Sequence, residues 1–132
     1  DEDGTVVAAV HAGWRSLCDG VIEATVKAMD VAPHKLLAWL GPAISQTHFE
    51  VGAEVREAFI AQHAQAKEAF VVHGESGKYL ADLYLLAHQR LSALGITSIH
   101  GGGRCTYGEP ECFFSYRRDG ATGRMGTFIW LA

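Results

Sequence analysis

Apolar residues recur along the chain at two spacings, one typical of strands and one typical of helices. A nearly continuous run of β-branched and small apolar residues over 5–11 predicts a strand buried on both faces. Apolar positions over 14–29 and 80–94 recur at helical spacing and predict two amphipathic helices. Gly95 is the expected stop of the second, and a third helix of about three turns is predicted over 53–64.

Short apolar runs between these helices predict further strands. The run 36–40 indicates a second buried strand, and 70–72 and 96–99 indicate two shorter ones. The end of the chain predicts a hairpin with arms 113–117 and 125–131, turning near Asp119-Gly120. Strands that alternate with helices before a closing hairpin predict an α/β (α+β) fold, with mixed β-sheets and helices packed outside them.

The first residues predict a tight turn that leads directly into the strand over 5–11. Asp3-Gly4 is a dipeptide typical of hairpin turns, and a hairpin turn joins two strands. Only Asp1 and Glu2 precede it. We therefore expect the partner strand to lie upstream, so that residues 1–132 are the C-terminal portion of a single, N-terminally truncated domain.

Composition narrows the classes of function. A chain of 132 residues with 48% hydrophobic residues fits one globular domain. A net charge of −4 gives no reason to expect nucleic acid as a partner. No apolar run approaches the roughly 20 residues needed to cross a membrane, and no signal peptide is evident, so a cytoplasmic location is expected. The three cysteines fit reduced thiols better than a disulfide scaffold, although Cys105 and Cys112 could pair across a loop.

The densest group of residues suited to chemistry is His11-Ala12-Gly13-Trp14-Arg15. A histidine at the end of a buried strand points into the crevice where open α/β sheets bind ligands. Arg15 and the first amide groups of the following helix could hold an anion. The pattern therefore indicates a metal or acid–base position beside an anion site, although a lone histidine in this place is more often structural.

Two further groups lie in predicted loops or beside turns. Gly41-Pro42-Ala43-Ile44 and Phe49-Glu50-Val51-Gly52 bound a loop in which Glu50 could bind a base or a sugar hydroxyl, or simply favour the next helix. Cys105 is a possible nucleophile or ligand, or plain packing. Arg118 and Arg124 flank the last turn, and either could pair with Asp119.

Several common motifs are absent from the sequence. It contains no His-x-His pair, no Cys-x-x-Cys, no Gly-x-Ser-x-Gly elbow, no Gly-x-Gly-x-x-Gly and no Walker-type loop. The copper sites of true laccases need several His-x-His pairs, so the sequence argues against a laccase reaction.

Taken together, the three groups resemble one family, the multicopper polyphenol oxidase-like (laccase-domain) proteins, and within it the bacterial purine nucleoside phosphorylase branch. The resemblance covers essentially all 132 residues and includes Phe113 to Gly120 and Thr122-Gly123-Arg124. It implies phosphorolysis of adenosine, inosine, guanosine and methylthioadenosine, with adenosine deamination beside it. Purine nucleosides and phosphate are the implied partners. Ser16 departs from the glycine usual in relatives.

The resemblance also implies one metal ion, usually read as zinc, held by a cysteine and two histidines. Only one of these ligands maps onto this chain, at His11, because the family's cysteine ligand precedes that histidine whereas all three cysteines here follow it. His11 is therefore the expected metal ligand and catalytic residue, and Arg15 and Glu50 are the expected substrate-binding residues. Two alternatives stay open: a copper-dependent polyphenol oxidase, and a binding module without catalysis.

Overall fold

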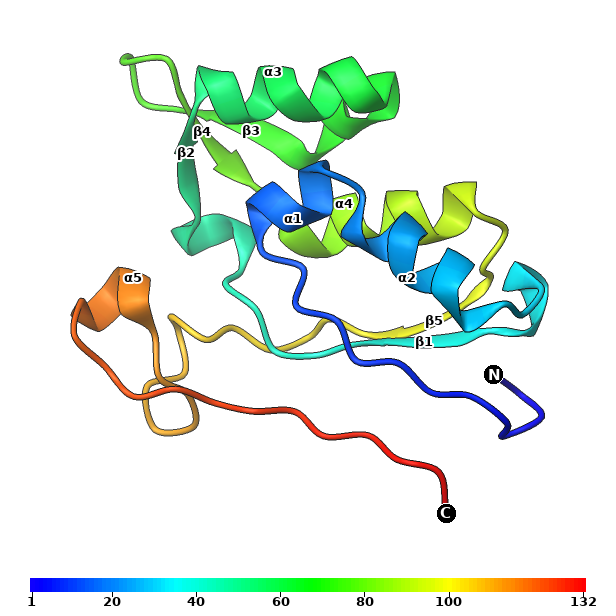
Figure 1. The fold of residues 1–132 in the computed structure, drawn as a ribbon. Helices are drawn as coiled ribbons and strands as arrows, with labels where there is room; N and C mark the ends of the chain where they lie inside the picture. Colours follow the sequence, from blue (N-terminus) through cyan, green and yellow to red (C-terminus); the bar gives the residue numbers. More distant parts are fainter.

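Two small β-sheets, one parallel and one antiparallel, organise the computed structural model, which describes residues 1–132 (Figure 1). In the parallel sheet β1 (Leu37–Leu40) pairs with β5 (Ser98–Gly101). In the antiparallel sheet β4 (Lys78–Ala81) lies between β2 (Glu50–Gly52) and β3 (Phe70–His73). The predicted α/β class with mixed sheets is confirmed.

Helices fill the space between and beside the two sheets. Figure 1 shows α3 and the antiparallel sheet at one end of the molecule, with the other long helices between them and the parallel sheet. None of these helices is long and apolar enough to cross a membrane. The helices are α1 (Trp14–Cys18), α2 (Val21–Met29), α3 (Ala53–Gln62), α4 (Leu83–Ala93) and α5 (Tyr116–Asp119), with 3₁₀ turns η1 (Pro33–Lys35), η2 (Gln46–His48) and η3 (Ala64–Ala69).

The single helix predicted over 14–29 is two helices in the structure. Gly20 has φ +95°, a left-handed conformation that breaks the helical path between α1 and α2. The break lets Leu17 of α1 and Ile22 of α2 both enter the core. Apolar periodicity continues across it, which explains why the spacing alone predicted one helix.

The helix predicted over 80–94 begins later than expected because a strand precedes it. Residues 78–81 form β4 and pair on both sides, which the apolar spacing did not indicate. The side chain of Asp82 then accepts a hydrogen bond from Leu85 N at 2.9 Å and caps α4. The end is as predicted: α4 stops before Gly95, which has φ +93°.

The prediction of a strand over 5–11 is wrong, because the segment is extended but belongs to neither sheet. Its residues are half-buried or exposed, since β1 pairs only with β5. The Asp3-Gly4 turn does form: the Asp1 carboxylate accepts from Thr5 N and Val6 N at 2.9 and 2.8 Å.

The prediction of a closing hairpin over 113–131 is also wrong. Residues 116–119 form α5, capped by Ser115, whose hydroxyl accepts from Arg118 N at 3.3 Å. Residues 121–132 pair with no strand and run as an extended tail, drawn in red in Figure 1. Local capping of a helix therefore prevails over the strand propensity of alternating aromatic residues.

The predicted strands over 36–40 and 96–99 exist with different burial and bounds. Leu36 is buried, but Leu37 and Trp39 are 60% and 63% exposed, so β1 has one covered face rather than two. β5 begins two residues later than predicted, and Ile96 belongs to the loop before it, where it packs in the core at 1% exposure.

Candidate functional site

His11 lies at the end of the extended segment, two residues before the glycine that precedes α1. Its side chain is exposed, and the imidazole lies against Gly13, where a β-carbon would meet Nε2 at 3.2 Å. The side chain of Ser16 donates to the carbonyl oxygens of His11 and Gly13, both at 3.1 Å. Gly13 thus gives the imidazole room, and Ser16, the departure from the family pattern, helps to fix the backbone beneath it.

Arg15 is close in sequence but engaged with a neighbour. Its guanidinium lies 4.6 Å from the centre of the Trp14 ring, and the side chain is exposed. The helix that was expected to support an anion here has only five residues, so its dipole is much smaller than that of the predicted helix over 14–29. A five-residue helix therefore adds little to the positive charge that Arg15 itself carries.

The loop that begins at Gly41 meets the segment around Cys105. Ala43 and Cys105 form an isolated parallel bridge, and Thr106 N donates to Ala43 O at 2.9 Å. The hydroxyl of Tyr84, on α4, accepts from Ala43 N at 2.8 Å and donates to Arg104 O at 2.6 Å. Burial raises the pKa of Tyr84, so the phenol remains a donor. Two of the three sequence groups, those at Ala43 and Cys105, therefore lie together.

Glu50 is on β2, and its side chain is exposed. One carboxylate oxygen lies 3.4 Å from Nε2 of His73, a residue of β3 in the same sheet. Its backbone oxygen accepts from the guanidinium of Arg117 at 2.8 Å. The structure thus pairs Glu50 with His73 and Arg117, and it places no contact between Glu50 and His11.

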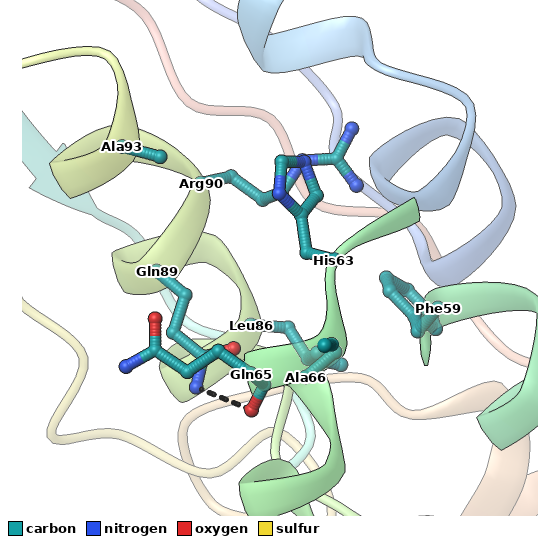
Figure 2. A pocket seen from close by; sticks show the side chains of 9 residues that line it. Phe59, His63, Gln65, Ala66, Leu86, Gln89, Arg90 and Ala93 are labelled. Atoms are coloured by element: carbon teal, nitrogen blue, oxygen red, sulfur yellow. Dashed lines mark hydrogen bonds between the residues drawn. The ribbon is translucent and has the colours of Figure 1, made fainter. Parts of the chain in front are cut away.

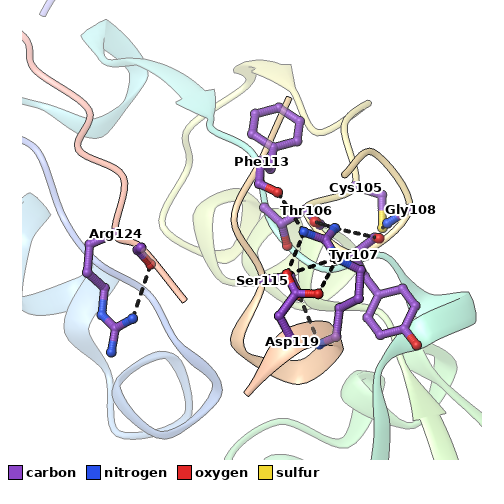
Figure 3. A network of polar contacts seen from close by, with 10 residues as sticks. Cys105, Thr106, Tyr107, Gly108, Phe113, Ser115, Asp119 and Arg124 are labelled. Atoms are coloured by element: carbon purple, nitrogen blue, oxygen red, sulfur yellow. Dashed lines mark hydrogen bonds and ion pairs between the residues drawn. The ribbon is translucent and has the colours of Figure 1, made fainter. Parts of the chain in front are cut away.

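Arg118 organises the loop that follows Cys105. Its guanidinium donates to the carbonyl oxygens of Thr106, Tyr107 and Phe113 at 2.9–3.0 Å, and to Asp119. Figure 3 shows these groups gathered around one point, with Arg124 lying apart. Arg124 bonds only to the nearby carbonyls of Thr122 and Gly123. Of the two arginines that flank the turn, Arg118 therefore pairs with Asp119 and Arg124 does not.

Two cavities lie away from His11. A small one of about 140 Å³ sits between η3 and α4, where Gln89 Nε2 donates to Gln65 O at 3.2 Å (Figure 2). A wider cleft of about 320 Å³ opens beside Cys105, and Tyr84 and Arg104 are among its lining residues. Neither cavity includes His11, so the expected cleft at that residue is not formed by either of them.

The residues of this chain do not by themselves fit the implied metal. No group of three or more His, Cys, Asp or Glu side chains is placed to hold a metal ion. His11 is accessible as a single ligand, whereas a catalytic zinc site needs about three protein ligands. His11 alone therefore cannot complete such a site.

The sequence interpretation missed the side chains around Cys105. Ser45 and His48 lie close to the sulfur, at positions about 60 residues earlier in the chain. A serine and a histidine in a loop carry no motif of their own, so the sequence offered no signal for either. A cysteine paired with a distant histidine is recognised in space rather than by spacing.

The fold and the motifs together define a mixed α/β domain whose three motif groups occupy loops, helix starts and the short strand β2. Comparison with known proteins gives the family: a model described as multi-copper polyphenol oxidoreductase laccase matches residues 1–132. The chain belongs to this family, as its sequence motifs predicted.

Individual relatives agree with this assignment. A protein of Shigella flexneri named purine nucleoside phosphorylase YfiH is 63% identical over 128 residues, covering 97% of this chain and 52% of the relative. A purine nucleoside phosphorylase of Pseudomonas aeruginosa is 53% identical, covering 99% and 54%. The crystal structure of the Neisseria meningitidis protein NMB0706 superposes with a TM-score of 0.91 at 53% identity, covering 93% of this chain and 50% of that one. The chain therefore spans about half the length of these relatives.

Proposed function

We propose that this chain is part of a metal-dependent purine nucleoside phosphorylase, with adenosine deamination as a second activity. The observation that carries the proposal is the 63% identity, over nearly the whole chain, to a relative named for phosphorolysis. The phosphorylase reaction would convert adenosine and phosphate to adenine and ribose 1-phosphate, and deamination would convert adenosine and water to inosine and ammonia. Zinc is the proposed metal, and copper is the alternative.

His11 is the proposed metal ligand that this chain contributes. The side chain is exposed, and Gly13 leaves its Nε2 uncrowded by a side chain. An imidazole in this position can accept a metal ion without first breaking apolar packing. The other ligands that the family resemblance implies would come from residues other than 1–132.

Arg15 is the proposed phosphate-binding residue, and Glu50 the proposed nucleoside-binding residue. The guanidinium of Arg15 is exposed and is stacked on Trp14 rather than paired with a carboxylate, so its donors remain available to an anion. The carboxylate of Glu50 is exposed and lies beside His73. A role for Glu50 would require it to exchange that partner for a hydroxyl group.

His11→Ala in the intact protein tests the proposal. We expect loss of both adenine and inosine formation by more than about 100-fold, together with loss of bound zinc, since substitution of a residue that only hydrogen-bonds a metal ligand already costs about 10–100-fold. In the metal-free proteins the free energy of unfolding should differ by less than about 0.5 kcal/mol, because the side chain is exposed, whereas the metal-loaded wild type gains the stabilisation of the bound metal as well. The measurements are product analysis with adenosine, with and without phosphate, metal content and a thermal melt.

His34→Ala is the matched control, because His34 is also exposed and lies in η1, outside the motif. It should keep both activities and the metal. Wild-type turnover by a folded, zinc-poor His11→Ala protein would contradict the proposal. Oxidation of phenols by a protein loaded with several copper ions would favour the laccase reaction instead, and the absence of any metal and turnover would favour a binding module.

A further inference from the structure

The sulfur of Cys105 is surrounded by hydrogen-bond donors from two separate loops. Ser45 Oγ donates to it at 3.0 Å, Gly108 N at 3.2 Å and Ser45 N at 3.4 Å. Nδ1 of His48 lies 3.6 Å away. A neutral thiol is a weak acceptor, so several donors aimed at one sulfur are suited to a thiolate.

The imidazole of His48 is held in place from the other side. It stacks on the ring of Tyr107, with centroids 4.4 Å apart and an angle of 18° between the planes. The hydroxyl oxygens of Ser45 and Thr47 lie 3.3 and 3.1 Å from the same Nδ1 atom. The arrangement resembles the cysteine–histidine pairs in which a histidine beside the sulfur favours its charged form.

The backbone that carries Cys105 is fixed as firmly as its side chain. Cys105 N donates to the carboxylate of Glu109 at 2.7 Å, and Arg104 Nε donates to the same carboxylate at 2.7 Å. These hydrogen bonds, the one from Cys105 N first, hold the pKa of Glu109 below its ordinary value. The carboxylate of Glu109 is therefore occupied by hydrogen bonds from Cys105 N and Arg104, on the backbone side of the loop and not at the sulfur.

The thiol is also accessible. Cys105 is half-buried and lines the cleft of about 320 Å³. Most of the other residues that line this cleft are polar, which suits a small polar molecule better than a large apolar one. They are Ser45, Gln46, Thr47, Asp82, Tyr84, Gly102, Gly103 and Arg104.

We propose that Cys105 and His48 form a reactive thiolate–imidazole pair, a modification site at which Cys105 attacks small electrophiles of the hydroperoxide class that enter the adjacent cleft. In this step the sulfur lone pair forms a bond to the terminal peroxide oxygen and the O–O bond breaks. The sulfur is oxidised to sulfenic acid, and the peroxide is reduced to hydroxide or alkoxide, which takes a proton from solvent. The cleft beside this pair does not include His11, the proposed metal ligand.

Titration of the thiol provides the sign of the expected pH dependence. Burial raises the pKa of Cys105, but the hydrogen bonds from Ser45, Gly108 and His48 outweigh it and lower the pKa to about 6. The sulfur should therefore become reactive as the pH rises through about 6 and stay so at neutral pH. The titratable groups that face this site are His48, Asp82, Tyr84, Arg104, Tyr107 and Glu109.

The other cysteines make internal controls. Cys18 is buried, and burial raises its pKa. Cys112 is exposed, so access alone would favour it over Cys105. A higher reactivity of Cys105 than of Cys112 would therefore report the environment of the sulfur and not its exposure.

The test is the rate of alkylation of each cysteine by iodoacetamide in the intact protein, measured by peptide mass spectrometry as a function of pH. We expect Cys105 to react at least about tenfold faster than Cys112 at about pH 6.5, with a midpoint near pH 6. Dilute hydrogen peroxide should give a dimedone adduct at Cys105 first. A midpoint of about 8.5 for Cys105, as for an ordinary thiol, or equal labelling of Cys112, would overturn the proposal.

Two variants test the origin of the reactivity. Ser45→Ala removes the hydroxyl donor, and His48→Phe removes Nδ1 while keeping a ring that can stack on Tyr107; each should raise the midpoint of Cys105. Ser92→Ala, an exposed serine on α4, should not change it. An unchanged midpoint in both variants would contradict the proposed pair, and the wild-type profile decides the question if either variant fails to fold.

Discussion

The hydroxyl group of Tyr84 connects loop segments that lie far apart in the sequence. It accepts from Ala43 N and donates to Arg104 O, 41 and 20 residues away. Its loss would leave the Ala43 amide without a partner in a half-buried position. This hydroxyl therefore adds a link from α4 to the two loops of the Cys105 site, which also contact each other through the bridge between Ala43 and Cys105.

Tyr84→Phe should lower the free energy of unfolding by about 1–2 kcal/mol, because an unsatisfied amide retains its desolvation cost. It should also speed the alkylation of Cys105 or change the pH midpoint of that reaction, because the loop around Ala43 loses a hydrogen bond. Urea denaturation measures the stability, and iodoacetamide labelling measures the reactivity of Cys105. Tyr116→Phe is the control, because Tyr116 is 73% exposed, and an equal effect in both variants would remove the special role of Tyr84.

At the scale of elements, the parallel pair of β1 and β5 depends on a glycine. Gly101 is the last residue of β5, lies opposite Leu40 and has φ +80°. A β-carbon there would collide with the backbone oxygen of Leu40. Gly102 N then donates to Leu40 O at 3.0 Å and directs the chain toward Cys105.

Gly101→Ala should therefore destabilise the protein by at least about 2 kcal/mol, from left-handed strain and the collision together. Thermal and urea unfolding measure the effect. Gly103→Ala is the matched control, because open space surrounds Gly103 and the substitution should change stability little. Equal stability of the two variants would show that the chain can relax around the added methyl group.

At the scale of the whole molecule, one ion pair lies within the helical layer. Arg90 of α4 is 6% exposed and donates through Nε to Glu23 of α2, and its Nη1 approaches Cys18 O at 3.4 Å. The second oxygen of Glu23 is buried without a hydrogen-bond partner. The pair joins α2 to α4, and the end of α1 lies against the same guanidinium.

Glu23→Gln should destabilise the protein by about 2–3 kcal/mol, because it leaves the buried guanidinium without its counter-charge. The double variant Glu23→Leu/Arg90→Met should recover most of that loss, since no unpaired charge remains. Urea unfolding of both variants checks this, with Glu57→Gln on the exposed face of α3 as control. A double variant less stable than Glu23→Gln would contradict the argument.

The molecule also exposes apolar side chains on segments that no strand covers. Leu37 and Trp39 on β1, and Phe128 and Trp130 in the tail, are 60–83% exposed. The sequence interpretation placed Leu37 and Trp39 in a buried strand and Phe128 and Trp130 in a hairpin arm, because hydrophobicity and β-propensity describe what a side chain prefers. Whether a partner strand is present is a property of the fold, and for 5–11 and 125–131 the described chain supplies none.

The sequence by itself determined the α/β class, the helices near 53–64 and 80–94, the stop at Gly95 and the family. These follow from local causes: apolar spacing, a glycine at a left-handed position and motifs of contiguous residues. The tertiary structure alone decided that the helix over 14–29 breaks at Gly20, that 78–81 joins a sheet, and that 113–119 ends in a capped helix. It also brought His48 and Ser45 to Cys105, which no spacing indicated. The physical reason is the same in each case, since pairing, burial and thiolate stabilisation depend on groups supplied by distant parts of the chain.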